Sequence, residues 1–132
     1  MITYLLVAIG GALGSMMRYG LSGLVMEMTG GTFPYGTMFV NVSGAMLIGV
    51  LASLAAPESL FFLPAPGRLL LMTGVCGGYT TFSTFSLETF NLMRDGEFLP
   101  AVANMLLSVI LCVISVWIGY SAVLILSRSR GG

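Results

Sequence analysis

The sequence contains no histidine and very few charged residues, and both absences restrict what the protein can be. Only 8% of its 132 residues are charged, five basic and five acidic, whereas soluble domains average about 25%. So little charge cannot cover a globule in water, and a formal net charge of zero gives no attraction to nucleic acid. Without histidine and with few carboxylates, neither a His-based catalytic site nor a typical metal site can be built, so we expect no enzyme.

Cysteine is also scarce. Cys76 and Cys112 both fall inside long apolar runs, which predicts two buried, inert thiols rather than a disulfide framework. The first apolar run has no basic segment before it, and we therefore expect a first membrane helix and not a cleaved signal peptide.

Apolar residues make up most of the chain, with 57% hydrophobic residues and a mean hydropathy of +1.01. A membrane-spanning helix needs about 20 mostly apolar residues. Four stretches qualify, at about residues 2–26, 37–56, 68–93 and 99–126, with short loops between them. The pattern predicts an all-α membrane protein, with residues 1–132 forming one four-helix transmembrane domain in the cell inner (plasma) membrane.

The arginines give only a weak signal for orientation. With four spans, the side that holds both termini and the middle loop has three arginines, and the other side has two. Such a small bias is weak by the positive-inside rule. A chain that inserts both ways can form an antiparallel dimer, which four short helices also favour because alone they make a poor permeation path. The three arginines are Arg68, Arg128 and Arg130.

The first two stretches carry small and polar residues at depth. Gly10 and Gly14 form a small-xxx-small pattern that permits close helix packing. Arg18 either faces the interior of the bundle or extends its side chain to the interface. Asn41 either joins helices by hydrogen bonding or offers its amide N–H groups to an anion.

The third stretch contains GGYTTFSTFSLE at residues 77–88, which is unusually polar for a membrane span. Gly77 and Gly78 weaken a helix, and the hydroxyls of Thr80 and Thr81 can cap a new one. The third helix is therefore predicted to break at the glycines. Broken helices in membranes expose carbonyls at one end and N–H groups at the other, and so form ion sites.

Two faces follow the predicted break. Phe82 and Phe85, at i and i+3, either pack in the core or direct their electropositive ring edges at an anion. Thr81, Thr84 and Glu88 line an adjacent face. Because a carboxylate beside an anion path repels the ion, we expect Glu88 to be structural, hydrogen-bonded to hydroxyls near the start of the second half-helix.

The fourth stretch has one stripe of small and polar residues. The stripe is either a packing seam or part of a polar path through the membrane. It consists of Asn104, Ser108, Cys112, Ser115 and Gly119.

Three segments resemble the Fluc (CrcB-type) fluoride channels of microbes. They are GGALGSMMR at 10–18, GTMFVNVSG at 36–44 and TGVCGGYTTFSTFSLET at 73–89. GGxTTFSTFS is a specific signature, and the likeness covers the whole chain in length and helix count.

The resemblance implies an antiparallel, dual-topology homodimer with two fluoride pathways and a structural sodium ion at its interface. The sodium would be held by the backbone carbonyls of Gly77 and Thr80. Arg18 matches the family's arginine, as a vestibule or structural residue. The expected fluoride path, with the hydroxyl face of the third helix included, comprises Asn41, Thr81, Phe82, Thr84, Phe85 and Ser108.

The expected function is passive export of fluoride, which lowers its cytoplasmic concentration and toxicity. The alternative is a small proton-coupled multidrug-type exporter, but such a protein needs an acidic residue in its first helix, and residues 2–26 contain none. A non-transporting assembly subunit would leave the polarity of Asn41 and of TTFSTFS without a use.

Overall fold

A computed structural model of the chain describes residues 1–57, 59 and 62–130; the side chain of Arg130, one of the arginines counted above, lies outside the described residues. Every regular element in this part is a helix, which confirms the all-α class. The long helices are α1 (Ile2–Thr29), α2 (Tyr35–Leu54) and α6 (Phe98–Arg130). Each is long and apolar enough to cross a membrane, so the chain is a multi-pass membrane protein.

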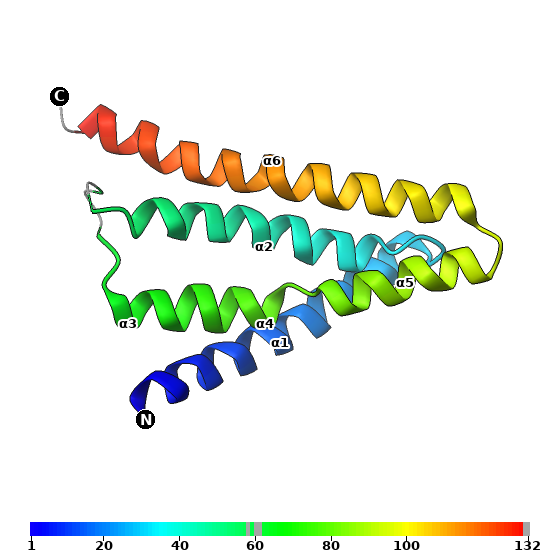
Figure 1. Cartoon of the computed structure of the whole chain (residues 1–132), viewed down its shortest axis with the longest axis horizontal. Coiled ribbons are helices and arrows are strands. Elements are labelled where there is room, and N and C mark those ends of the chain that lie inside the picture. Colours follow the sequence, from blue (N-terminus) through cyan, green and yellow to red (C-terminus); the bar gives the residue numbers. More distant parts are fainter. Residues whose placement is uncertain (58, 60–61, 131–132) are drawn as a thin grey trace.

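The remaining predicted span consists of shorter segments that lie end to end (Figure 1). They are α3 (Ala65–Arg68), the π-helix η1 (Leu69–Cys76), α4 (Gly77–Tyr79) and α5 (Phe82–Arg94). The long helices extend a few residues beyond the apolar runs. Thus α1 continues to Thr29 and stops where Gly30 adopts a left-handed φ of 80°, a conformation that glycine tolerates at a helix end.

The third helix is interrupted as predicted, but the glycines are not the interruption. Gly77 and Gly78 are both helical, in α4, and the extended residues are Thr80 and Thr81. Gly78 has a different purpose: a Cβ atom there would collide with the carbonyl oxygen of Gly11. The glycine pair was misread because the sequence does not distinguish a glycine that breaks a helix from one that admits a neighbouring helix.

Two glycine seams hold the helices together. Along the first, α1 packs against η1 and α4. A Cβ on Gly10 or Gly14 of α1 would collide with the backbone of η1. Along the second, α2 and α6 run parallel and side by side (Figure 1), with Gly49 against Val116 and Gly119 against Met46. Helices in lipid commonly associate through close backbone approach at small residues. The second seam therefore holds α2 and α6 together.

Much of α6 faces outward. Its contacts are with α2 and α5, and large apolar side chains on its other faces are exposed, such as Trp117 at 70% and Ile125 at 67%. Apolar side chains at this exposure are expected in a helix that faces lipid or another protein chain within the membrane.

Candidate functional site at the helix break

The break is a two-residue extended link between α4 and α5. Thr80 has φ −86° and ψ 157°, and Thr81 has φ −150° and ψ 118°. Thr81 is the N-cap of α5, because its hydroxyl accepts the Thr84 N–H at 3.2 Å. The predicted capping by a threonine hydroxyl is confirmed, and it satisfies a backbone donor at the start of α5 that has no helical partner.

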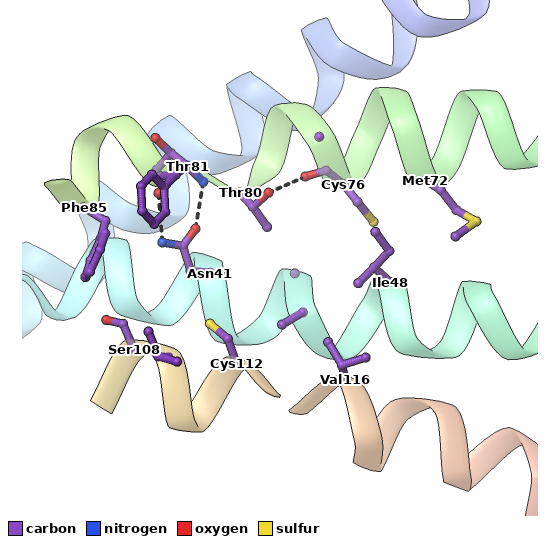
Figure 2. Close-up of a pocket in the computed structure, with 15 residues that line it drawn as sticks. Asn41, Ile48, Met72, Cys76, Thr80, Thr81, Phe85, Ser108, Cys112 and Val116 are labelled. Atoms are coloured by element: carbon purple, nitrogen blue, oxygen red, sulfur yellow. Dashed lines mark hydrogen bonds between the residues drawn. The ribbon is translucent and has the colours of Figure 1, made fainter. Parts of the chain in front are cut away.

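Asn41 of α2 holds the link from one side. Its Oδ1 accepts the Thr81 N–H at 2.7 Å, and its Nδ2 donates to the Thr81 carbonyl at 3.0 Å (Figure 2). The amide oxygen therefore replaces the helical acceptor of the Thr81 N–H, and the amide NH₂ adds a second donor to the Thr81 carbonyl, which as the N-cap carbonyl accepts the first bond of α5. Of the two readings of Asn41, the joining of helices is observed.

Arg18 of α1 contacts α4 just before the link. Its Nε donates to the Gly78 carbonyl at 3.0 Å, and the Ser15 hydroxyl lies 3.5 Å from the same oxygen. Arg18 is half-buried, so it faces the interior of the helix bundle instead of extending to the interface. Within the described residues no carboxylate pairs with it. Its charge neutralises the C-terminal end of α4, where a helix carries partial negative charge.

Two further carbonyls at the break lose their helical donors. In a continuous helix the Gly77 carbonyl would accept the Thr81 N–H, which instead goes to Asn41. The Thr80 carbonyl would accept the Thr84 N–H, which instead goes to the Thr81 hydroxyl. Gly77 and Thr80 thus present two of the oxygens that the interruption releases; the Tyr79 carbonyl loses its Ser83 donor by the same geometry.

A cavity of about 390 Å³ opens beside the break. Its polar end is formed by the link, by Asn41 and by Ser108 of α6, whereas its other end is apolar around Ile48 and Val116 (Figure 2). Most of the residues assigned to an ion path from the sequence line this one cavity, together with the two residues assigned to sodium. These are Asn41, Thr81, Phe82, Phe85 and Ser108, with Gly77 and Thr80.

The two phenylalanines differ in exposure. Their ring centroids lie 5.4 Å apart with an interplanar angle of 46°, a tilted arrangement. Phe85 is 9% exposed and points into the cavity (Figure 2), whereas Phe82 is 77% exposed. A tilted pair leaves ring edges available, and ring edges carry partial positive charge.

The remaining predicted residues do not line this cavity. Thr84 accepts a hydrogen bond from the Thr81 hydroxyl at 3.0 Å. Glu88 is hydrogen-bonded as expected, but to Thr37 of α2 at 2.8 Å and not to hydroxyls beside the break. It lines a second cavity of about 220 Å³ with Asn91 and Asp95. The correction follows from geometry, since Glu88 lies nearly two turns beyond the N-cap.

Two pairs of residues support the site, and of these four the sequence pattern had indicated only Asn104. The Tyr79 hydroxyl and the Ser43 hydroxyl lie 2.8 Å apart and join α4 to α2. Thr89 accepts a hydrogen bond from Asn104 at 2.9 Å and joins α5 to α6. Most of the α6 stripe is buried, so it forms the seam against α2 and α5, and Ser108 and Cys112 also reach the cavity. The sequence offered one indication of these partners: Tyr79 is adjacent to Thr80, and Thr89 lies one helical turn after Phe85.

Known proteins with similar sequences cover nearly the whole chain. Residues 5–120 match the family described as "CrcB-like protein, Camphor Resistance (CrcB)". A Rhodospirillum rubrum protein is 53% identical over 93% of this chain and 96% of its own length. Relatives from Opitutus terrae and Methylocella silvestris are 51% and 47% identical, over 97% of this chain and 97% and 98% of their lengths. All three are named fluoride-specific ion channel FluC.

A match of this length, together with three helices that can each cross a membrane, places the protein in the cell membrane. The chain belongs to the CrcB-like protein family.

Proposed function

We propose that the protein is a fluoride channel that conducts the ion passively out of the cell and so lowers its cytoplasmic concentration. The observation that carries the proposal is the cavity at the helix break, where hydroxyl groups, an amide and aromatic rings converge without a lysine or arginine. The names of relatives with about half of their residues identical support the same function.

The chemistry of the cavity suits a small anion that must pass and not stay. Conduction requires binding that is favourable enough to replace water and weak enough to release the ion. A formal positive charge would hold fluoride too firmly, whereas ring edges attract an anion weakly. Each hydroxyl at the polar end must release an internal acceptor before it can donate to the ion, because Thr80, Thr81 and Ser108 donate to Cys76, Thr84 and Asn104. Arg18 has its Nε committed to the Gly78 carbonyl and does not line this cavity.

The deciding experiment is efflux from liposomes that contain the purified protein. Fluoride should leave down its gradient, with no proton gradient, and chloride should leave far more slowly. Efflux that required a proton gradient, or transport of cationic drugs without fluoride flux, would contradict the proposal. The exporter alternative has no support. The carboxylate that α1 carries, Glu27, is exposed in the last turn of the helix and not at its centre, and the relatives are named as ion channels. The polar cavity likewise argues against a non-transporting assembly subunit.

We also propose that the working unit is an antiparallel homodimer of copies inserted in opposite orientations. The exposed Phe82 ring and the open cavity beside it support this arrangement, because a second chain would complete the walls. The weak arginine bias supports insertion in both directions. Topology reporters fused to the chain should give signals on both sides of the membrane. A single orientation would contradict this part of the proposal.

The carbonyls of Gly77 and Thr80 fit a structural sodium ion at the centre of such a dimer. The break takes the helical donor from each, so their oxygens are free to coordinate a cation. Two copies would supply four neutral oxygens, a donor set for a hard monovalent cation. No group of three or more His, Cys, Asp or Glu residues within the described part of the chain offers an alternative metal site. When bound, the ion would stabilise carbonyls that otherwise lack partners.

A further inference from the structure

A chain of buried hydrogen bonds connects the polar end of the cavity to the backbone of α5. Thr89 Oγ1 donates to the Phe85 carbonyl at 2.7 Å, Asn104 Nδ2 donates to Thr89 Oγ1 at 2.9 Å, and Ser108 Oγ donates to Asn104 Oδ1 at 3.3 Å. The three side chains are 4%, 1% and 6% exposed, respectively. Of these three, Ser108 lines the cavity.

The direction of every bond in this chain follows from its first member. A threonine inside a helix commonly donates its single hydroxyl hydrogen to the carbonyl four residues earlier, as Thr89 does to Phe85. Thr89 then has only lone pairs to offer Asn104, which must present its NH₂ group. The amide oxygen of Asn104 therefore faces Ser108, and Ser108 must donate.

This direction determines what an anion meets in the cavity. Ser108 has one hydrogen, and that hydrogen is held by Asn104. The serine oxygen thus turns lone pairs toward the cavity, and lone pairs repel an anion. An anion gains the hydrogen only if the hydroxyl leaves Asn104 and rotates.

We propose that Asn104 and Thr89 are positioning residues that set the fluoride affinity of the path. The inference rests on the function proposed above and assigns these two residues a part in it. They hold the Ser108 hydrogen behind the cavity wall, so that fluoride must displace Asn104 as its acceptor. The competition weakens binding at Ser108, and weak binding is what permits the ion to leave.

The test is Thr89→Val, which removes the hydroxyl at nearly constant volume and without touching the cavity. Asn104 then loses its acceptor, and its amide is free to turn its NH₂ group toward the serine oxygen. The Ser108 hydrogen is released into the cavity. The half-saturating fluoride concentration should fall about fivefold, the factor for a net hydrogen bond of about 1 kcal/mol. Maximal flux should fall as well, because the ion leaves more slowly.

Three controls separate this effect from damage to the fold. Thr89→Ser keeps the hydroxyl and should retain the wild-type concentration dependence. Ser115→Ala removes a buried hydroxyl from α6, the helix of Asn104 and Ser108, outside the hydrogen-bond chain. This variant should also retain the wild-type concentration dependence. In a Ser108→Ala background, Thr89→Val should produce no further shift, since the two sites then lack the group that couples them.

A lower maximal flux at an unchanged half-saturating concentration would overturn the inference, because a structural defect gives that result. An equal shift in Thr89→Ser would overturn it too. The wild-type protein offers a measurement that needs no variant. The side-chain amide signal of Asn104 in ¹⁵N NMR should move when fluoride is added at constant ionic strength, while that of Asn91 stays. A wild type that conducts fluoride with an unmoved Asn104 signal contradicts this inference alone, whereas a wild type without fluoride flux contradicts the proposed function.

Discussion

At the scale of single residues, Asn41 and Thr81 have the closest pairing in the site. The amide satisfies both backbone groups of Thr81, and the Thr81 hydroxyl satisfies a third backbone group at the start of α5. An unpaired backbone group costs several kcal/mol in lipid. Asn41 and the Thr81 hydroxyl therefore satisfy the backbone groups of the extended link before any ion is considered.

The two phenylalanines offer a direct test of the ion path. Phe82→Ile and Phe85→Ile keep apolar bulk but remove the electropositive ring edge. Each should reduce fluoride efflux from liposomes at least tenfold while the protein still assembles in the membrane. Phe90→Ile is the matched control, since Phe90 lies on α5 but outside the lining of the cavity. Wild-type flux in both variants would show that these rings only pack.

Glu88 tests the difference between support and permeation. Its Oε1 accepts from the Thr37 hydroxyl, and a glutamine side chain can accept the same hydrogen bond through its amide oxygen. Glu88→Gln should therefore retain assembly and most of the flux, with the same dependence on pH as the wild type. Efflux measured from about pH 5 to pH 8 checks this. If the substitution abolished a pH dependence without harming assembly, the carboxylate would belong to the permeation path.

At the scale of elements, the sequence predicts the positions of the long helices well. It does not predict whether a glycine breaks its helix or allows another helix to pack closely. Apolar length alone places α1, α2 and α6 to within a few residues. The broken helix was predicted from Gly77 and Gly78, yet the extended residues are the threonines that follow. The error has a physical basis. What separates the roles of two adjacent glycines is the position of α1, and a tertiary contact is not encoded in local propensity.

The glycine pair supplies its own matched control. A Cβ on Gly78 would collide with the Gly11 carbonyl, whereas a Cβ on Gly77 meets no atom of the described chain within 4 Å. Gly78→Ala should separate α1 from α4 and lower stability by about 1–3 kcal/mol. Gly77→Ala should leave the folded protomer intact. Thermal unfolding in detergent, followed by helix content, compares the two, and equal losses would contradict the seam.

Seven of the residues assigned from the sequence line one cavity. Four of them belong to the TTFSTFS pattern, and the other three are Asn41, Gly77 and Ser108. The sequence could not identify the partners of Glu88 and Asn104, because each forms a hydrogen bond to a residue on another helix. Sequence spacing relates residues along one helix, and the packing angle between helices decides the rest.

At the scale of the whole molecule, we expect the stability of the proposed dimer to depend on its cation. Replacing sodium with a large organic cation such as N-methylglucamine should reduce dimer stability and fluoride flux, because the carbonyls of Gly77 and Thr80 would lose their partner. Thr80→Ser should preserve the sodium dependence, since the proposed ligand is main-chain oxygen. Equal flux and equal dimer stability after exhaustive removal of sodium would contradict the site.

The parallel pairing of α2 and α6 has a consequence for how the protein is made. The main packing partner of α2 is synthesised more than forty residues after it, after the whole broken helix. Until then Gly49 lacks the Val116 backbone that it contacts in the folded chain. The pair of α1 with η1 and α4 is available earlier, so we expect assembly in two stages. A translation intermediate arrested before Phe98 should retain the first seam and leave α2 loosely held, which makes the second half of synthesis the interval in which membrane chaperones and proteases have the greatest access.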